Sequence, residues 1–172
     1  MKNLSTKKTF LSNISRHLMN VTSKFWQWLK KRFYREVLTE RQFWQAYELG
    51  RKNFSFTRLL NVNLGSVELK HLNLQKADLR SCYFPKSLSL ARLNLTGVIL
   101  SGIDLSDRNL QGAILSKAVL NSVNLAGANL DRTNLSQANL HRSNLEQSSL
   151  SKANLTRAKL SGANLYICIE RT

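Results

Sequence analysis

The residues best suited to catalysis or metal binding never gather in this sequence. Its histidines are His17, His71 and His141, and its cysteines are Cys82 and Cys168. Their spacing matches no Cys/His metal motif, and no phosphate-binding loop, nucleophile elbow or dinucleotide fingerprint occurs. We therefore predict no catalytic, cofactor or metal site, and a protein that is not an enzyme.

The chemistry that the chain does offer is cationic. Its 172 residues carry 26 Lys and Arg against 10 Asp and Glu, a net charge of +16. Residues 1–52 hold 12 against 3, or +9, and residues 53–172 hold 14 against 7, or +7. This balance predicts an anionic partner, and composition leaves open whether it is nucleic acid, lipid headgroups or an acidic protein.

Residues 1–38 form a basic amphipathic head. Aromatic and aliphatic residues recur at helical spacing on one face, and Lys and Arg take the other. Such a helix binds either an anionic surface or a partner protein. The candidate anchor residues are Lys24, Trp26, Trp28, Lys30, Lys31, Arg32, Phe33 and Arg35. An acid-free start is also typical of transit peptides, so organelle targeting by residues 1–35 is an alternative to a cytoplasmic protein, free or peripheral at a membrane.

Residues 39–52 are expected to form a capping helix. Thr39 and Gln42 match a capping box, which favours a helix start after a break near Leu38, and Gly50 is placed to end the helix. The apolar stripe of the head, including Val37, runs into this segment. A helix here would cover the open end of a following solenoid.

Beyond residue 53 an apolar residue stands at every fifth position. Leucine does so without a miss from Leu90 to Leu165, 16 centres, and a second train runs from Phe54 to Phe84. A period of five suits neither a helix nor a strand, because both would scatter these side chains over several faces. The step from Phe84 to Leu90 is six and contains Pro85, which predicts a bulge or short loop.

Each unit adds a small residue two positions before the leucine and often Asn one position before it. Stretches such as "ANLDRTNLSQANLHRSNL" and "ANLTRAKLSGANL" resemble the pentapeptide repeat family, whose motif is A(D/N)LXX. The resemblance covers residues 53–166. It implies an all-β solenoid, a right-handed quadrilateral parallel β-helix with four pentapeptides per coil, leaving residues 167–172 as a tail. The 23 centres then give five to six coils, preceded by an α-helical N-terminal segment.

Residues twenty apart should stack on one face of such a solenoid. Arg92, Arg132 and Lys152 then form a basic column, which is either a solvated surface or a strip for phosphates or acidic protein. Ile99, Ile114 and Val119 replace the usual Asn and would expose an apolar patch. Such a patch often marks a partner site, although β-branched residues also simply suit strands.

Arg108 stands in a slot that normally holds a small inward residue. Because a buried charge needs a partner, we expect the coil to distort and the guanidinium to reach solvent. A buried pair with Asp104 or Asp107 is the alternative.

The carboxyl end offers too little chain to cover the last coil. We therefore expect a homodimer through Leu165, Tyr166 and Ile167, stacked end to end about a twofold axis, an arrangement that the family resemblance also implies.

Two functions follow from these patterns. The first is a non-enzymatic protein–protein interaction scaffold, and the second is a membrane-surface or nucleic-acid-binding adaptor that acts through the basic head. The resemblance adds a third and weaker one, because relatives include inhibitors of DNA gyrase that imitate DNA. That activity needs an acidic surface, whereas this repeat is basic.

Overall fold

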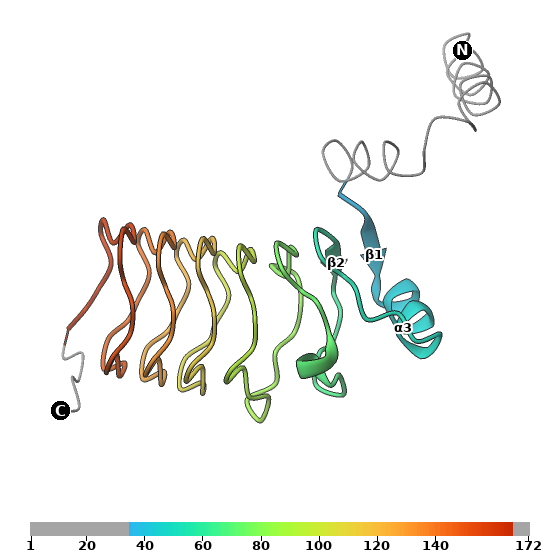
Figure 1. Cartoon of the computed structure of the whole chain (residues 1–172), viewed down its shortest axis with the longest axis horizontal. Coiled ribbons are helices and arrows are strands. Elements are labelled where there is room, and N and C mark those ends of the chain that lie inside the picture. The colour runs from blue at the N-terminus through green and yellow to red at the C-terminus, as the bar shows by residue number, and fades with distance from the viewer. Residues whose placement is uncertain (1–34, 167–172) are drawn as a thin grey trace, which may run out of the picture. The chain divides into compact units, whose positions relative to one another are not determined.

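The computed structural model describes residues 35–166, and within them the chain winds into a parallel β-helix (Figure 1). Isolated bridges pair residues twenty positions apart, for example Asn94 with Ile114 and Ile114 with Asn134. Four five-residue units thus complete each coil, and the leucine of every unit points into a continuous core. Leu100, Leu105, Leu110 and Leu115 are at most 1% exposed. Leucines five residues apart can all enter one core because the chain turns a corner after every unit, so that each side of the coil points its leucine toward the axis.

The corners explain the two polar positions of the repeat. After each leucine the chain makes a turn, as between Leu95 and Val98, whose N–H donates to the Leu95 carbonyl at 3.0 Å. The second residue of the turn has a positive φ, which glycine adopts without strain, as at Gly97. Lys, Arg, Gln, Ser and Asp also take this conformation here, at 54° to 60°. The ladder of neighbouring coils therefore imposes a backbone shape that these residues do not prefer on their own.

Asparagine before the leucine stabilises the same turn. The Oδ1 atom of Asn94 accepts the N–H of Thr96 at 3.2 Å, and Asn134 and Ser136 repeat the contact at 3.0 Å. This side chain to backbone bond satisfies an N–H that the corner would otherwise leave without a protein partner. On one side of the coils the amides also bond to each other, since Asn144 donates to Asn124 at 3.3 Å and Asn164 donates to Asn144 at 3.1 Å.

The amino end of the solenoid is closed by a strand and a helix. β1 (Val37–Thr39) pairs in parallel with β2 (Arg58–Leu60), and α3 (Glu40–Glu48) follows directly. The Gln42 amide oxygen accepts from the Thr39 N–H and hydroxyl, both at 3.0 Å. At the other end of α3, Gly50 has φ +87° and its N–H donates to Tyr47 at 2.9 Å, so the helix ends in a glycine cap.

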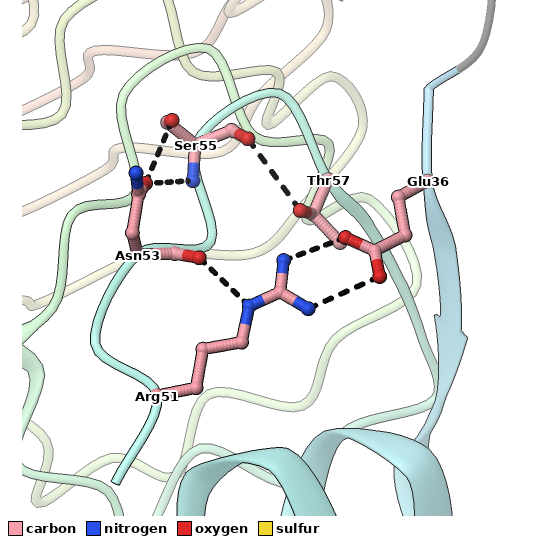
Figure 2. Close-up of polar contacts among 5 residues, drawn as sticks. All are labelled: Glu36, Arg51, Asn53, Ser55 and Thr57. Atoms are coloured by element: carbon pink, nitrogen blue, oxygen red, sulfur yellow. Dashed lines mark hydrogen bonds and ion pairs between the residues drawn. The ribbon is translucent and has the colours of Figure 1, made fainter. Parts of the chain in front are cut away.

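Phe43 of α3 plugs the core. It is 0% exposed and its ring centroid lies 4.9 Å from that of Phe54, the first inward residue of the repeat. Just outside, the Arg51 guanidinium binds both carboxylate oxygens of Glu36 at 3.0 and 2.6 Å, and its Nε donates to the Asn53 carbonyl (Figure 2). These contacts tie β1 to the first coil.

One prediction about this end is wrong. Val37 was expected on the apolar face of a helix, but it lies in β1 and is 49% exposed, whereas its neighbour Leu38 is buried. Helical periodicity does not reveal that the first coil offers an unpaired strand edge, and pairing with that edge outweighs the local preference.

The coils are interrupted where the period slips. A 3₁₀ helix, η1 (Leu69–His71), replaces one corner, and between Phe84 and Leu90 one extra residue enters the chain. Across this point Asp78 pairs with Ile99, twenty-one positions on, and the Leu79 N–H donates to the Ile99 carbonyl at 3.0 Å. Pro85 of the extra loop fits against Gly65, since a Cβ added there would come within 2.9 Å of the proline Cγ.

Arg108 holds this loop, and the prediction that it reaches solvent is wrong. The residue is 6% exposed, and its guanidinium donates to the backbone carbonyls of Phe84 and Pro85. These two neutral carbonyls, and neither expected carboxylate, are the hydrogen-bond partners of the buried guanidinium; the Phe84 carbonyl accepts no backbone N–H within residues 35–166, and the Pro85 carbonyl also accepts the Leu88 N–H at 3.0 Å.

Candidate functional site

The apolar patch of Ile99, Ile114 and Val119 lies on two adjoining sides of the coils. Ile99 and Val119 pair in consecutive coils, and Ile114 lies between Asn94 and Asn134 on the neighbouring side. Ile114 is 37% exposed, and the other two are half-buried. An isoleucine in this slot cannot accept the N–H two residues on, so the patch forgoes a turn bond that Asn would make. That loss favours a role for the patch beyond folding.

The basic column of Arg92, Arg132 and Lys152 flanks this patch. All three are exposed and occupy the positive-φ corner position in coils that follow one another, with Gly112 between the first two. Their corner leads directly into the side that carries Ile114. Exposed cations beside a small apolar surface suit an acidic protein segment.

The next corner adds cations that the sequence analysis did not select. Lys76, Lys117 and Arg157 stand there at positive φ, and Lys117 lies between Ile114 and Val119 along the chain. The signal was present in the sequence, since all three follow a leucine by two positions. With Arg142, seven of the thirteen non-glycine residues at positive φ within residues 35–166 are basic, so cations are frequent at the projecting corners.

The carboxyl end of the described solenoid is open. Leu165 is 41% and Tyr166 is 66% exposed, and Leu150, Leu155 and Leu160 are half-buried although their equivalents one coil earlier are buried. The N–H groups of Leu155 and Leu160 have no backbone partner within residues 35–166. Ile167, the third residue of the expected dimer end, lies outside the described residues.

The proposed anchor can be placed only in part. Lys24, Trp26, Trp28, Lys30, Lys31, Arg32 and Phe33 lie outside the described residues, and Arg35 is exposed. Within residues 35–166 no helix is long and apolar enough to cross a membrane.

The titratable groups of this part form no reactive centre. Burial raises the pKa of the Cys82 thiol to about 12, so the sulfur stays protonated and weakly nucleophilic at neutral pH. Backbone donation from Ser106 lowers the pKa of Asp104. Among residues 35–166, no three His, Cys, Asp or Glu side chains are grouped as metal ligands.

The comparisons with known proteins agree with the repeat geometry. The family model for pentapeptide repeats matches eight copies over residues 53–84, 89–127, 99–137 and 128–166. The chain therefore belongs to the pentapeptide repeat family. It matches no protein of curated function at a significant level.

Solved structures of other pentapeptide repeat proteins are also similar. One from the Arabidopsis thaliana thylakoid lumen is 23% identical over 70% of this chain and 66% of its own, with a TM-score of 0.28. HetL of the cyanobacterium Nostoc, involved in heterocyst differentiation regulation, is 27% identical over 77% of this chain and 63% of its own, with a TM-score of 0.35. The chain thus spans slightly less than two thirds of either. QnrB1, a plasmid-mediated fluoroquinolone resistance protein, is 17% identical over 64% of this chain and 73% of its own, with a TM-score of 0.33.

Proposed function

We propose that this protein is a non-enzymatic scaffold that binds an acidic partner protein along one face of a right-handed quadrilateral solenoid of five to six coils. The apolar patch of Ile99, Ile114 and Val119 provides the contact, and the basic column of Arg92, Arg132 and Lys152 orients the partner. The observation that carries this proposal is the departure from Asn at three neighbouring slots, each of which gives up a turn bond. The corner cations at its border supply charge complementarity.

Partner binding is tested by replacing the three apolar residues of the patch with Asn, the residue usual at this position of the repeat. The triple variant Ile99→Asn, Ile114→Asn and Val119→Asn keeps the fold and removes the patch, and Asn129→Ser on another side is the matched control. Proteins captured from lysate by the unmodified chain should be lost with the triple variant and kept with the control. Changing Arg92, Arg132 and Lys152 to Gln should weaken capture most at low salt. Equal capture by all variants would refute the proposal.

The basic head supports a second candidate, in which it docks the protein on an anionic membrane surface or on nucleic acid. The supporting observation is the charge of residues 1–38, nine Lys and Arg against one Glu, beside Trp26 and Trp28. A truncated chain should begin at Arg35, because β1 and Glu36 belong to the cap. If it binds anionic vesicles and DNA as well as the full chain does, this candidate fails. A preference for vesicles over DNA would select the membrane.

We further propose that two chains stack through their carboxyl ends. The exposed Leu165 and Tyr166 and the unpaired N–H groups of the last coil support a twofold contact, which closes both ends without forming a fibre. Sedimentation should give twice 19.6 kDa, and Tyr166→Lys with Ile167→Lys should give a monomer. A monomeric unmodified chain at micromolar concentration would exclude the dimer.

Inhibition of a topoisomerase by DNA mimicry is the weakest candidate. This candidate rests on the family resemblance alone, and residues 53–172 carry a net +7, whereas a mimic of DNA needs the opposite sign.

A further inference from the structure

The phase slip leaves a hollow on one side of the solenoid, between Tyr83 in one coil and Asp104 in the next. Its volume is about 380 Å³, and its walls include Arg80, Phe84, Lys86 and Arg108. A hollow of this size is large enough for a small ligand. Tyr83 borders it and is 61% exposed, so the site can be reached from solvent.

The hollow exists because the ladder is broken there. In the next pair of coils the Leu105 N–H donates to Asn124 at 2.7 Å, and the Asn124 N–H donates to Ile103 at 3.0 Å. The equivalent donors at the slip are the N–H groups of Phe84 and Asp104, and neither has a backbone acceptor within residues 35–166. Two backbone donors in the walls of the hollow are thus left for another acceptor.

The side chains around the hollow add uncompensated positive charge. Arg108 is buried with two neutral carbonyls as partners, and its Nε–H is enclosed without an acceptor. An enclosed donor without a partner in a native protein often marks a place for a water or an ion.

The other charged walls are Lys86, Arg80 and Asp104. Lys86 makes no ion pair within the described residues, whereas Arg80 binds Asp78 at 2.8 Å. Asp104 is the carboxylate in the walls, and its Oδ1 already accepts from the Ser106 N–H and the Asn124 amide. Because Asp78 neutralises Arg80, the two cations Lys86 and Arg108 against the one carboxylate Asp104 leave the walls at +1.

We propose that this hollow is an oxyanion site, which takes one phosphate or carboxylate group of a small ligand between Lys86 and the free N–H groups of Phe84 and Asp104. Backbone N–H groups and cations together are the donors that bind such groups in proteins. The site is independent of the partner-binding face, which lies on other sides of the coils.

The test is a titration of the full chain with inorganic phosphate, followed by amide NMR at pH 7 and constant ionic strength. Sodium acetate is the carboxylate probe, and sodium chloride is the control. Saturable shifts at Phe84, Gly102 and Asp104 with phosphate or with acetate support the site and identify the group that it prefers. Lys86→Gln should weaken binding about tenfold, as expected for one charge-assisted contact.

Lys117→Gln is the matched control, because Lys117 is an exposed cation on another side of the coils, and it should change the affinity less than about twofold. Shifts that do not saturate, that spread over the basic corners, or that are equal in the two variants would overturn the proposal. Arg108 is left unchanged in this test, since its loss also disturbs the loop.

Discussion

Replacing Arg108 by Ala tests whether the phase slip depends on a buried guanidinium. Alanine is the residue that the repeat itself places in the equivalent slots Ala113, Ala118 and Ala128, so the backbone accepts it. Any loss of stability must then come from the contacts of the arginine. These are the two hydrogen bonds to the carbonyls of Phe84 and Pro85 and the space that the side chain fills.

The expected loss follows from those contacts. Two hydrogen bonds from a charged donor contribute about 1.5–3 kcal/mol each, and the cost of burying the guanidinium offsets part of that sum. Truncation adds the penalty of a Phe84 carbonyl without a partner and of a void at the slip, whereas the Pro85 carbonyl keeps the Leu88 N–H at 3.0 Å. We expect the free energy of unfolding to fall by about 2–4 kcal/mol. Arg108→Lys should restore less than half of it, because an ammonium lacks the fork that spans both carbonyls.

The assay is urea unfolding followed by tryptophan fluorescence and by circular dichroism. Arg142→Ala is the control, since Arg142 is an exposed corner residue and its change should stay within about 0.5 kcal/mol. The two probes should diverge in Arg108→Ala, because Trp44 lies in the amino-terminal cap and the slip then separates two stretches of coils. A urea midpoint equal to that of Arg142→Ala, or above it, would refute the stabilising role.

Three further changes test the core, the corners and the buried thiol. Leu135→Asp should prevent folding, as judged by circular dichroism, because it places an unpaired charge at a 0% exposed position, whereas Ser136→Asp at the adjoining corner should fold. Gly97→Ala should lower the free energy of unfolding by about 2 kcal/mol or more, and Gly102→Ala by about 1 kcal/mol. Both glycines have a positive φ, but only a Cβ at position 97 would meet a neighbour, the Cγ of Lys76 at 2.8 Å. Equal losses in urea unfolding would contradict the steric part of this reasoning. The raised pKa of Cys82, about 12 against an ordinary 9.0, means that the folded state favours the neutral thiol, so the contribution of this thiol to stability should be constant below pH 9 and fall between pH 9 and 12. Cys82→Ala should flatten that fall in urea unfolding at pH 8 and 10.5, and an unchanged slope would show that other groups cause it.

Much of the solenoid could be predicted from the repeat. The leucine every fifth residue and the small residue before it each express a local requirement that recurs from coil to coil, and glycine marks some of the corners. Even the slip at Pro85 was visible, since the spacing from Phe84 to Leu90 is six. The stacking of Ile99 on Val119 follows from the same count, because twenty residues return the chain to the same side.

The positions that could not be predicted depend on contacts between distant parts of the chain. Arg108 is buried because carbonyls of the preceding coil accept its hydrogen bonds. The residue type at position 108 does not show which backbone groups of another coil are available to it. The sequence did not identify Phe43 as the residue that covers the end of the core. Its burial depends on contact with Phe54 at the amino-terminal end of the first coil.

The sequence by itself thus determined the period, the inward leucines, the corners and the place of the interruption, because each is repeated or marked by local chemistry. Only the tertiary structure decided that Val37–Thr39 is a strand, that Arg108 is buried, and that the slip opens a hollow with free backbone donors. These features depend on which hydrogen-bonding groups remain unpaired when coils stack. That balance is a property of the assembled ladder and of no single segment.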